Sequence, residues 1–287
     1  MREARGETTA RALLHVIVMK AWLLAALLAA VSLGGLLLPS AYARETPAWI
    51  AQARGQDWFD VLVVVPWLVI CGVALRERSR SRAYRWRVVV AGTYAYCVYE
   101  MLLYAFAVHF NALFLVYCAT LGVSSFALLS ALGDLARERH AVDRRAAKLG
   151  GGFLVAVGAL FGLLWLADIV PAMLRGAPSR DLAETGLFTN PVHVIDLSFV
   201  LPLHVFVGYA LWHRQRVGEV YGPVVLGFGI IMAASIAGMQ IAIAAMGGDL
   251  VFPVTIALVA VAGASAGILA RMLFPPHVPA VTTIHAV

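Results

Sequence analysis

Two apolar segments decide the fold: DVLVVVPWLVICGVALRER (60–78) and DLSFVLPLHVFVGYALWHR (196–214). Each begins with Asp, has Pro six residues later and Gly six residues after that, and ends with Ala-Leu and a basic cluster. At a constant offset of 136 residues, nine of the 21 paired positions that start at 60 and 196 are identical. Apolar composition alone gives roughly two or three matches and does not align Asp, Pro and Gly. The two segments therefore predict an internal repeat.

The repeat predicts how the chain is organised. A unit of about 136 residues holds four membrane-length segments, so we expect the first copy at 1–149, the second at 150–274 and a short tail at 275–287. Four crossings return a chain to the side on which it started, so the two copies have the same orientation. Parallel repeats of this kind are related by a pseudo-twofold axis along the membrane normal. The expected fold class is an all-α polytopic membrane protein with eight transmembrane helices in two parallel four-helix repeats.

The composition agrees with a membrane protein. Of the 287 residues, 62% are apolar and only 13% are charged, and the mean hydropathy is +0.85. Soluble domains carry about a quarter charged residues. The net charge of +6 does not indicate a nucleic-acid partner, because the Arg residues lie in short runs between apolar segments, as in loops that face an anionic leaflet. We expect the lipid bilayer as the main partner and no nucleic acid.

Segment lengths predict the individual spans. A spanning helix needs about 20 mostly apolar residues. The first candidate also resembles a signal peptide, because Ala41-Tyr42-Ala43 is an A-x-A sequence, but its apolar run is long and the repeat gives it an internal counterpart, so we expect it to be retained. The eight predicted spans are 13–38, 58–75, 87–108, 111–132, 150–173, 193–212, 222–246 and 251–274.

The loops predict the orientation. The connections at 76–87, 134–145 and 213–216 are rich in Arg, and the other connections carry far fewer basic residues. Loops rich in Lys and Arg stay in the cytoplasm. We therefore expect a multi-pass protein of a bacterial inner membrane with both termini in the cytoplasm.

One outer connection is expected to form a helix. The segment at 45–57 is too polar to span, Thr46 before Pro47 is a good helix start, and Trp49 favours the headgroup level. We expect a short interfacial helix there. The next residues, Asp60 and its copy Asp196, are then interpreted as helix caps at the outer ends of two spans.

Glu100 is the ionisable residue that sequence explains least. It lies about eight residues from the outer end of its span, which is roughly 12 Å deep at 1.5 Å per residue. Charged residues at such depth are expensive and mark functional sites. The alternative is a set of hydrogen bonds between helices that only holds the bundle together. The residues expected with Glu100 in one polar layer are Tyr96, Tyr104, Tyr117, His204 and Gln240.

Other polar residues are expected at the outer mouth: Asp168, His109, Asn111 and His193. The two histidines are candidate metal ligands, but their spacing is no signature and solvation at the surface is the better explanation. The cysteines Cys71, Cys97 and Cys118 all fall inside apolar segments and predict no disulfide. We expect no metal and no cofactor.

The stretches FNALFLVYCATLGVSSFALL (110–129), ETPAWIAQARGQDWFDVLVVVPWL (45–68) and TNPVHVIDLSFVLPL (189–203) resemble a family of uncharacterised multi-span bacterial membrane proteins. That resemblance implies a bacterial membrane and no particular activity. Three functions stay open: a carrier or channel for a small solute or ion, a non-catalytic scaffold or accessory subunit that binds a partner membrane protein, and a membrane enzyme acting at the outer mouth. A carrier predicts a cavity that reaches Glu100, a scaffold predicts an apolar groove, and an enzyme predicts an outer pocket where His109 and His193 meet an acid.

Overall fold

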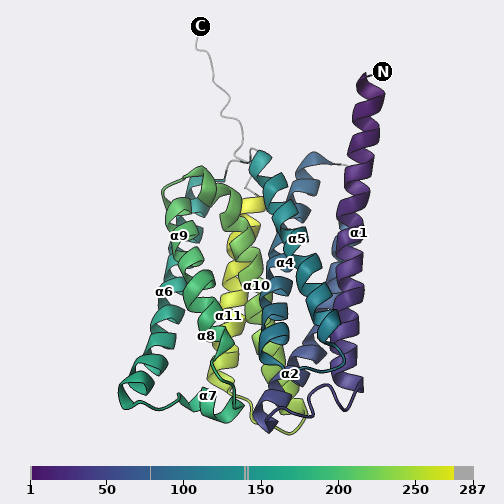
Figure 1. Cartoon of the computed structure of the whole chain (residues 1–287). Coiled ribbons are helices and arrows are strands. Elements are labelled where there is room, and N and C mark those ends of the chain that lie inside the picture. The colour runs from purple at the N-terminus through teal and green to yellow at the C-terminus, as the bar shows by residue number, and fades with distance from the viewer. Residues whose placement is uncertain (1, 78, 139, 141, 275–287) are drawn as a thin grey trace.

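The computed structural model describes residues 2–77, 79–138, 140 and 142–274, and these residues form helices and connecting loops without a strand. Long helices run side by side between two ends of the molecule, where the loops lie (Figure 1). Eight spans are long and apolar enough to cross a membrane among these residues, so the predicted number is confirmed: Val18–Leu37, Pro47–Ala74, Ser81–Ala107, Phe114–Arg137, Arg144–Arg175, Pro191–Trp212, Arg216–Ala245 and Phe252–Leu273.

Six of these spans are single helices. They are α1 (Arg2–Leu37), α4 (Arg80–Ala107), α5 (Phe114–Arg137), α6 (Arg144–Arg175), α10 (Arg216–Ala245) and α11 (Phe252–Leu273). The other two are built from three consecutive pieces each. The first is α2 (Pro47–Phe59), η1 (Asp60–Val64) and α3 (Val65–Ala74), and the second is α8 (Pro191–Ile195), η2 (Asp196–Val200) and α9 (Leu201–Trp212).

The middle piece of each composite span is a turn of π-helix that begins at the repeated Asp. The N–H of Val65 bonds to the carbonyl of Asp60, and the N–H of Leu201 bonds to the carbonyl of Asp196. A proline follows each of these donors, at Pro66 and Pro202. Proline has no N–H and crowds the carbonyl four residues earlier, so one wider turn before it keeps the helix continuous.

Two predictions about this region are wrong. The helix expected on the outer surface at 45–57 is the first part of a continuous helix that reaches Ala74, and it packs on α10. Asp60 and Asp196 are not caps, because the caps are Thr46 and Asn190, whose side chains accept hydrogen bonds from backbone N–H groups. The predicted helix start at Thr46 and Pro47 is confirmed.

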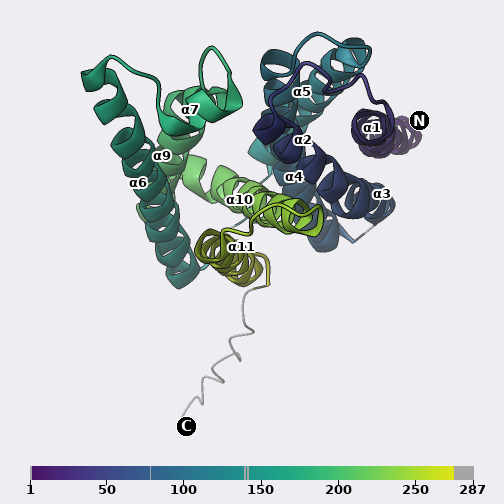
Figure 2. The same ribbon diagram turned by 90° about the horizontal axis from the view of Figure 1, so that it is seen from below.

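The helices lie in two groups when seen from one end (Figure 2). The group α1–α5 stands beside the group α6–α11, with α4 and α10 in the centre. Within the groups, α1 packs on α3, α4 on α5, α6 on α9 and α10 on α11. Between the groups, α10 packs on both α4 and α2. The two central helices approach so closely that a Cβ added at Gly92 would stand 2.8 Å from the backbone of Gly227.

The end that the loop charges predict to face outward, called the outer end below, carries the small helix α7 (Arg180–Thr185). By the predicted orientation this end is the lower one in Figure 1, where α7 and α2 lie near each other. A hydrogen bond of 3.1 Å from Thr46 Oγ1 to the carbonyl of Thr185 joins the two groups there. The predicted tail at 275–287 lies outside the described residues.

Candidate functional site

The Asp60 carboxyl lies in the interior of the α1–α5 group. Its residue is 0% exposed, because the π-helical turn directs the side chain toward α1 and α4. The hydroxyl of Tyr96 donates to Oδ1 at 2.9 Å, and the amide of Gln56 donates to the same oxygen at 3.2 Å. Ser32 of α1 donates to Oδ2 at 3.5 Å. Three helices therefore supply hydrogen bonds to this one carboxyl.

A second carboxyl, Asp57, lies one helical turn toward the outer end and is also 0% exposed. Tyr104 of α4 donates to its Oδ1 at 2.8 Å, and Tyr42 of the loop before α2 donates to its Oδ2 at 2.7 Å. Burial raises the pKa of the Tyr42 hydroxyl, and the Asp57 carboxylate raises it further. Tyr42 therefore stays a hydrogen-bond donor at any ordinary pH.

Glu100 completes the cluster and differs from the two aspartates. It is 3% exposed, and neither of its carboxyl oxygens makes a hydrogen bond of regular geometry with a described residue. The carboxyl of Asp60 is near enough to interact with it directly, and Asp57 acts on it over a longer range. A buried polar group without a partner is costly, and a buried carboxylate beside another one costs more. Glu100 is therefore held in place at a free-energy cost.

The cluster carries an excess of negative charge. No Lys or Arg among the described side chains bonds to Asp57, Asp60 or Glu100. Arg54 acts on Asp57 from a distance, but its side chain is exposed. Buried charges in proteins are normally paired. Something outside the described side chains, such as a proton or a bound cation, has to offset part of this charge.

A cavity adjoins the cluster. Its volume is about 130 Å³. Glu100 forms part of its wall, with the carboxyl oxygens fully buried behind the surface. Most of the wall is apolar or aromatic, and it comes from four helices. The wall includes Trp49, Gln52 and Gln56 of α2, Tyr96, Tyr99, Glu100, Leu103 and Tyr104 of α4, Val192 of α8, and Met232, Ser235, Ile236 and Met239 of α10.

Trp49 supplies a second polar group without a partner. Its residue is 8% exposed, and its indole N–H makes no hydrogen bond with a described residue. Seven residues separate it from Gln56 along α2, which is roughly 10 Å at 1.5 Å per residue. The indole nitrogen, like the Glu100 oxygens, is buried behind the cavity surface.

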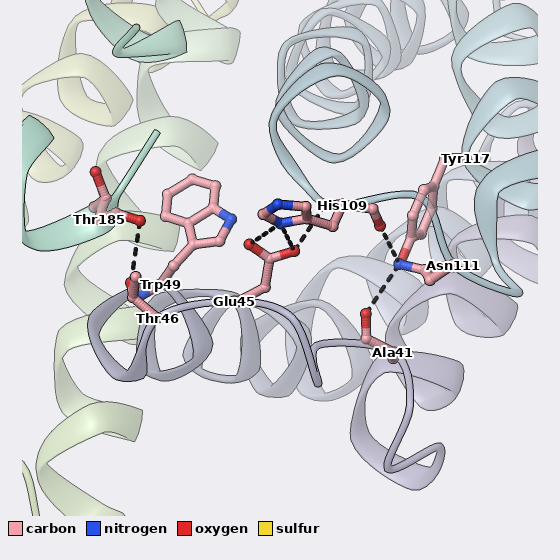
Figure 3. Close-up of polar contacts among 8 residues, drawn as sticks. All are labelled: Ala41, Glu45, Thr46, Trp49, His109, Asn111, Tyr117 and Thr185. Carbon is pink, nitrogen blue, oxygen red and sulfur yellow. Dashed lines mark hydrogen bonds and ion pairs between the residues drawn. The ribbon is translucent and has the colours of Figure 1, made fainter. Parts of the chain in front are cut away.

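The loops at the outer end close over this region (Figure 3). The buried Glu45 carboxylate accepts from the backbone N–H of His109 at 2.7 Å and lies 3.0 Å from Nδ1 of the same residue. Asn111 donates to the carbonyl of Ala41 at 2.9 Å. These contacts tie the loop before α2 to the loop between α4 and α5. The predicted outer residues His109 and Asn111 therefore hold two loops together.

Tyr117 joins the cluster, as the predicted polar layer requires. Its ring packs edge-on against Tyr104 with the centroids 5.4 Å apart, and its hydroxyl accepts from Asn111 at 3.4 Å.

His204 and Gln240 do not join the cluster. The His204 ring bonds through Nδ1 to the carbonyl of Val200 at 2.7 Å and lines a different cavity. Gln240 is half-buried on α10 and lines none of the cavities described here.

The second repeated acid has its own surroundings. Trp165 of α6 donates to Asp196 at 2.8 Å, and the Tyr99 hydroxyl of α4 also interacts with that carboxyl. The Trp165 ring packs on His193 with the centroids 4.7 Å apart.

His193 and His109 line separate outer cavities, so the pocket that an enzyme at the outer mouth predicts does not form around them. Asp168 lies on α6, half-buried, with one oxygen unbonded.

An apolar groove of about 550 Å³ runs between the two groups on the other side of Tyr99. It lies between α4 and α5 of one group and η2, α9 and α10 of the other. His204 and Phe228 belong to its wall, together with Leu128, Leu203 and Phe206. No polar atom is exposed on its surface.

Sequence reasoning did not predict Asp57, Gln56, Tyr42 or Trp49 as site residues. The available signal was the helical spacing of Trp49, Gln56 and Asp60, which share one face if the helix is continuous through Asp60. The interpretation of 45–57 as a separate surface helix hid that face. Among the described residues, no group of three or more His, Cys, Asp or Glu side chains is arranged to hold a metal ion.

Comparison with protein families, with curated proteins and with solved structures finds no match to this chain, so the site has to be interpreted from its own geometry.

Proposed function

We propose that this integral membrane protein is a carrier for a small solute or ion and that the cavity at Glu100 is its binding site. The observation that carries the proposal is a buried carboxyl in the wall of a cavity, without a hydrogen bond of regular geometry and without a cationic partner among the described residues. An ionisable residue inside the membrane is costly, and in carriers such residues bind the transported species or the coupled proton. A purely structural role would leave Glu100 hydrogen-bonded and the space around it filled.

The position of the cavity supports this function. We infer that the two groups of helices are copies of one four-helix unit, since α1 packs on α3 as α6 does on α9, and both copies have the π-helical turn at the repeated Asp. In parallel-repeat transporters the substrate lies where the repeats meet. Five pairs of cavity residues differ by the repeat offset of 136: Gln56 and Val192, Tyr96 and Met232, Tyr99 and Ser235, Glu100 and Ile236, and Leu103 and Met239.

The two copies contribute unequally to the wall. The first copy supplies an amide, two phenols and a carboxyl, whereas the matching positions of the second copy are mostly aliphatic. Polar groups on one wall and apolar groups on the other orient a bound solute. The excess negative charge of Asp57, Asp60 and Glu100 attracts a cation or holds a proton. In a transport cycle that exchanges the bound cation for a proton, the charge of the three carboxyls stays balanced at every stage.

Flux into vesicles tests the proposal. The purified protein is reconstituted into liposomes, and uptake of a panel of small labelled cations, zwitterions and neutral solutes is compared with empty liposomes. We expect at least one solute to be taken up, and Glu100→Gln to slow that uptake at least tenfold. The matched control is Asp168→Asn, which also removes the charge of a carboxyl with an unbonded buried oxygen but lies outside the cavity. Equal uptake by wild type and a folded Glu100→Gln variant contradicts the proposal.

The apolar groove favours a second candidate, a non-catalytic subunit that binds a partner membrane protein. A groove of about 550 Å³ without polar surface suits an apolar helix. A photo-crosslinking residue at Phe206 in the groove would then yield one defined protein adduct in native membranes. The same residue at Val73, which is exposed on α3 outside the groove, is the control. Adducts with lipid alone at both positions would contradict this candidate.

We also propose the orientation. The Arg-rich connections at 76–87, 134–145 and 213–216 belong in the cytoplasm of a bacterial cell, and α7 with the loop before α2 faces outward. With this orientation the cavity lies in the outer half of the bundle, and both termini are cytoplasmic. A reporter enzyme fused at Asp249, between α10 and α11, should be active only in its periplasmic form.

A further inference from the structure

We propose that the ligand of the Glu100 cavity is a small quaternary or alkylated ammonium ion with a hydrogen-bond acceptor at its other end. The proposal names the substrate class of the carrier and so rests on the proposed function for its transport role. Its binding step is independent of transport and is tested separately.

The charge of the ligand follows from the acid cluster. The oxygens of Asp57 and Asp60 are occupied by hydrogen bonds from Tyr42, Tyr104, Tyr96 and Gln56, but no cationic side chain among the described residues bonds to either carboxyl. Hydrogen bonds from neutral groups stabilise a carboxylate without removing its charge. Glu100 adds a third carboxyl, which makes no hydrogen bond of regular geometry with a described residue. When the cluster releases its proton, the field inside the cavity is negative and favours a monovalent cation.

The apolar character of the ligand follows from the wall. Four aromatic side chains line the cavity: Trp49, Tyr96, Tyr99 and Tyr104. A metal ion needs several oxygen ligands to replace its water, and few polar atoms reach this surface. Alkylated ammonium ions hold water weakly and are attracted to the faces of aromatic rings. The cavity thus fits a cation with an apolar shell better than it fits a bare or hydrated inorganic ion.

The acceptor at the other end follows from Gln52. This residue lies one turn along α2 from Trp49 and lines the wall of the cavity. Its amide nitrogen is a hydrogen-bond donor. A hydroxyl or carbonyl oxygen of the ligand would accept from that amide while the ammonium end lies toward Glu100. The volume of about 130 Å³ limits the ligand to a few non-hydrogen atoms beyond the ammonium group.

Competition against labelled choline tests the charge. Choline is the probe for an ammonium ion with an acceptor, and 3,3-dimethylbutan-1-ol has the same shape without the charge. Binding to the purified protein in nanodiscs is followed by scintillation proximity. We expect choline to bind at least tenfold more tightly than the alcohol, and Glu100→Gln to lower the affinity for choline about tenfold with no change for the alcohol. Tetrapropylammonium, which is too large for the cavity, should not compete.

Gln52→Leu tests the acceptor and keeps a side chain of similar size. Choline affinity should fall severalfold in this variant, whereas the affinity for tetramethylammonium, which has no acceptor, should not change. Gln240→Leu is the control, because Gln240 is half-buried on α10 and does not line the cavity. This pair of ligands compares two affinities on one folded variant, so it remains informative if Glu100→Gln fails to fold.

Each remaining outcome decides between the two proposals. Equal affinity for choline and its neutral analogue, equal losses in Glu100→Gln and Asp168→Asn, or no choline binding to the wild-type protein overturns the ammonium site. If another solute is transported while choline does not bind, the carrier stands and the ligand class is wrong. If choline binds as expected but no member of the panel is taken up, the site stands and the carrier function is wrong.

Discussion

Tyr96 donates a 2.9 Å hydrogen bond to Oδ1 of Asp60, the residue at which the helix of the second span widens into a π-helical turn. The bond links α4 to that turn inside the α1–α5 group. Tyr96 also accepts from Gln56 at 2.6 Å, so its hydroxyl is the centre of a small network.

Removal of this hydroxyl should destabilise the protein. Tyr96→Phe keeps the ring but leaves Gln56 and Asp60 each short of one partner, and the loss should be about 1–2 kcal/mol. The measurement is thermal unfolding in detergent. Tyr209→Phe is the control, because Tyr209 is exposed and makes no side-chain hydrogen bond among the described residues. Equal midpoints for the two variants would show that the network contributes nothing to stability.

Glu100→Gln should have the opposite effect on stability while it abolishes function. The amide is neutral and can donate to the Asp60 carboxylate, so a repulsive pair becomes a hydrogen-bonded one. We expect a higher unfolding temperature than that of the wild type. Functional sites are often kept at a cost in stability, so a variant that is more stable and inactive indicates such a site. A Glu100→Gln variant that unfolds at a lower temperature would instead assign Glu100 a structural role.

The contact between α4 and α10 should tolerate a methyl group on one side only. A Cβ at Gly92 would stand 2.8 Å from the backbone of Gly227 and Phe228, and backbone cannot move aside cheaply. A Cβ at Gly227 meets nothing nearer than 3.6 Å. Gly92→Ala should therefore cost about 1–3 kcal/mol, as overpacking does, and Gly227→Ala should cost little. Equal unfolding temperatures for the two alanine variants would contradict the observed contact.

The contact between Glu45 and His109 should protect the loop before α2. Glu45→Ala removes the acceptor of the His109 backbone N–H and ring, so the loop should open more often. Arg44 is exposed next to it and is a trypsin site. We expect faster cleavage after Arg44 in Glu45→Ala, measured by mass spectrometry of the fragments. Because residue 45 follows the cleaved bond, each rate is divided by that of a synthetic peptide of residues 38–52 with the same sequence. Glu184→Gln, a change at an exposed acid of α7, is the control and should leave the cleavage rate as it is.

The eight spans were predictable because an apolar run of sufficient length is a local property of the chain. The local start of α2 at Thr46 and Pro47 was predictable for the same reason. The continuity of that helix through Asp60 was not. Gln52, Gln56 and Asp57 make the segment polar, and a sequence does not reveal that neighbouring helices and the loop at Tyr42 cover these side chains.

The candidate site was predicted in part. Glu100, Tyr96, Tyr104 and Tyr117 do lie together, because they were chosen by depth and by helical face on α4 and the adjacent α5. His204 was chosen by depth alone, and equal depth places no constraint on the direction of a side chain. It lies on the far side of Tyr99 and Phe228, in the apolar groove.

The close approach at Gly92 and Gly227 has a mechanical consequence. Two helices that cross at small residues bring their backbones into contact, so a change of the crossing angle pivots at this point. Beyond this crossing, α4 continues past Tyr96 and Tyr99 to Glu100. Tyr96 is bonded to Asp60 of one group, and Tyr99 interacts with Asp196 of the other. A tilt of α4 about the crossing therefore changes the contacts of both carboxyls together.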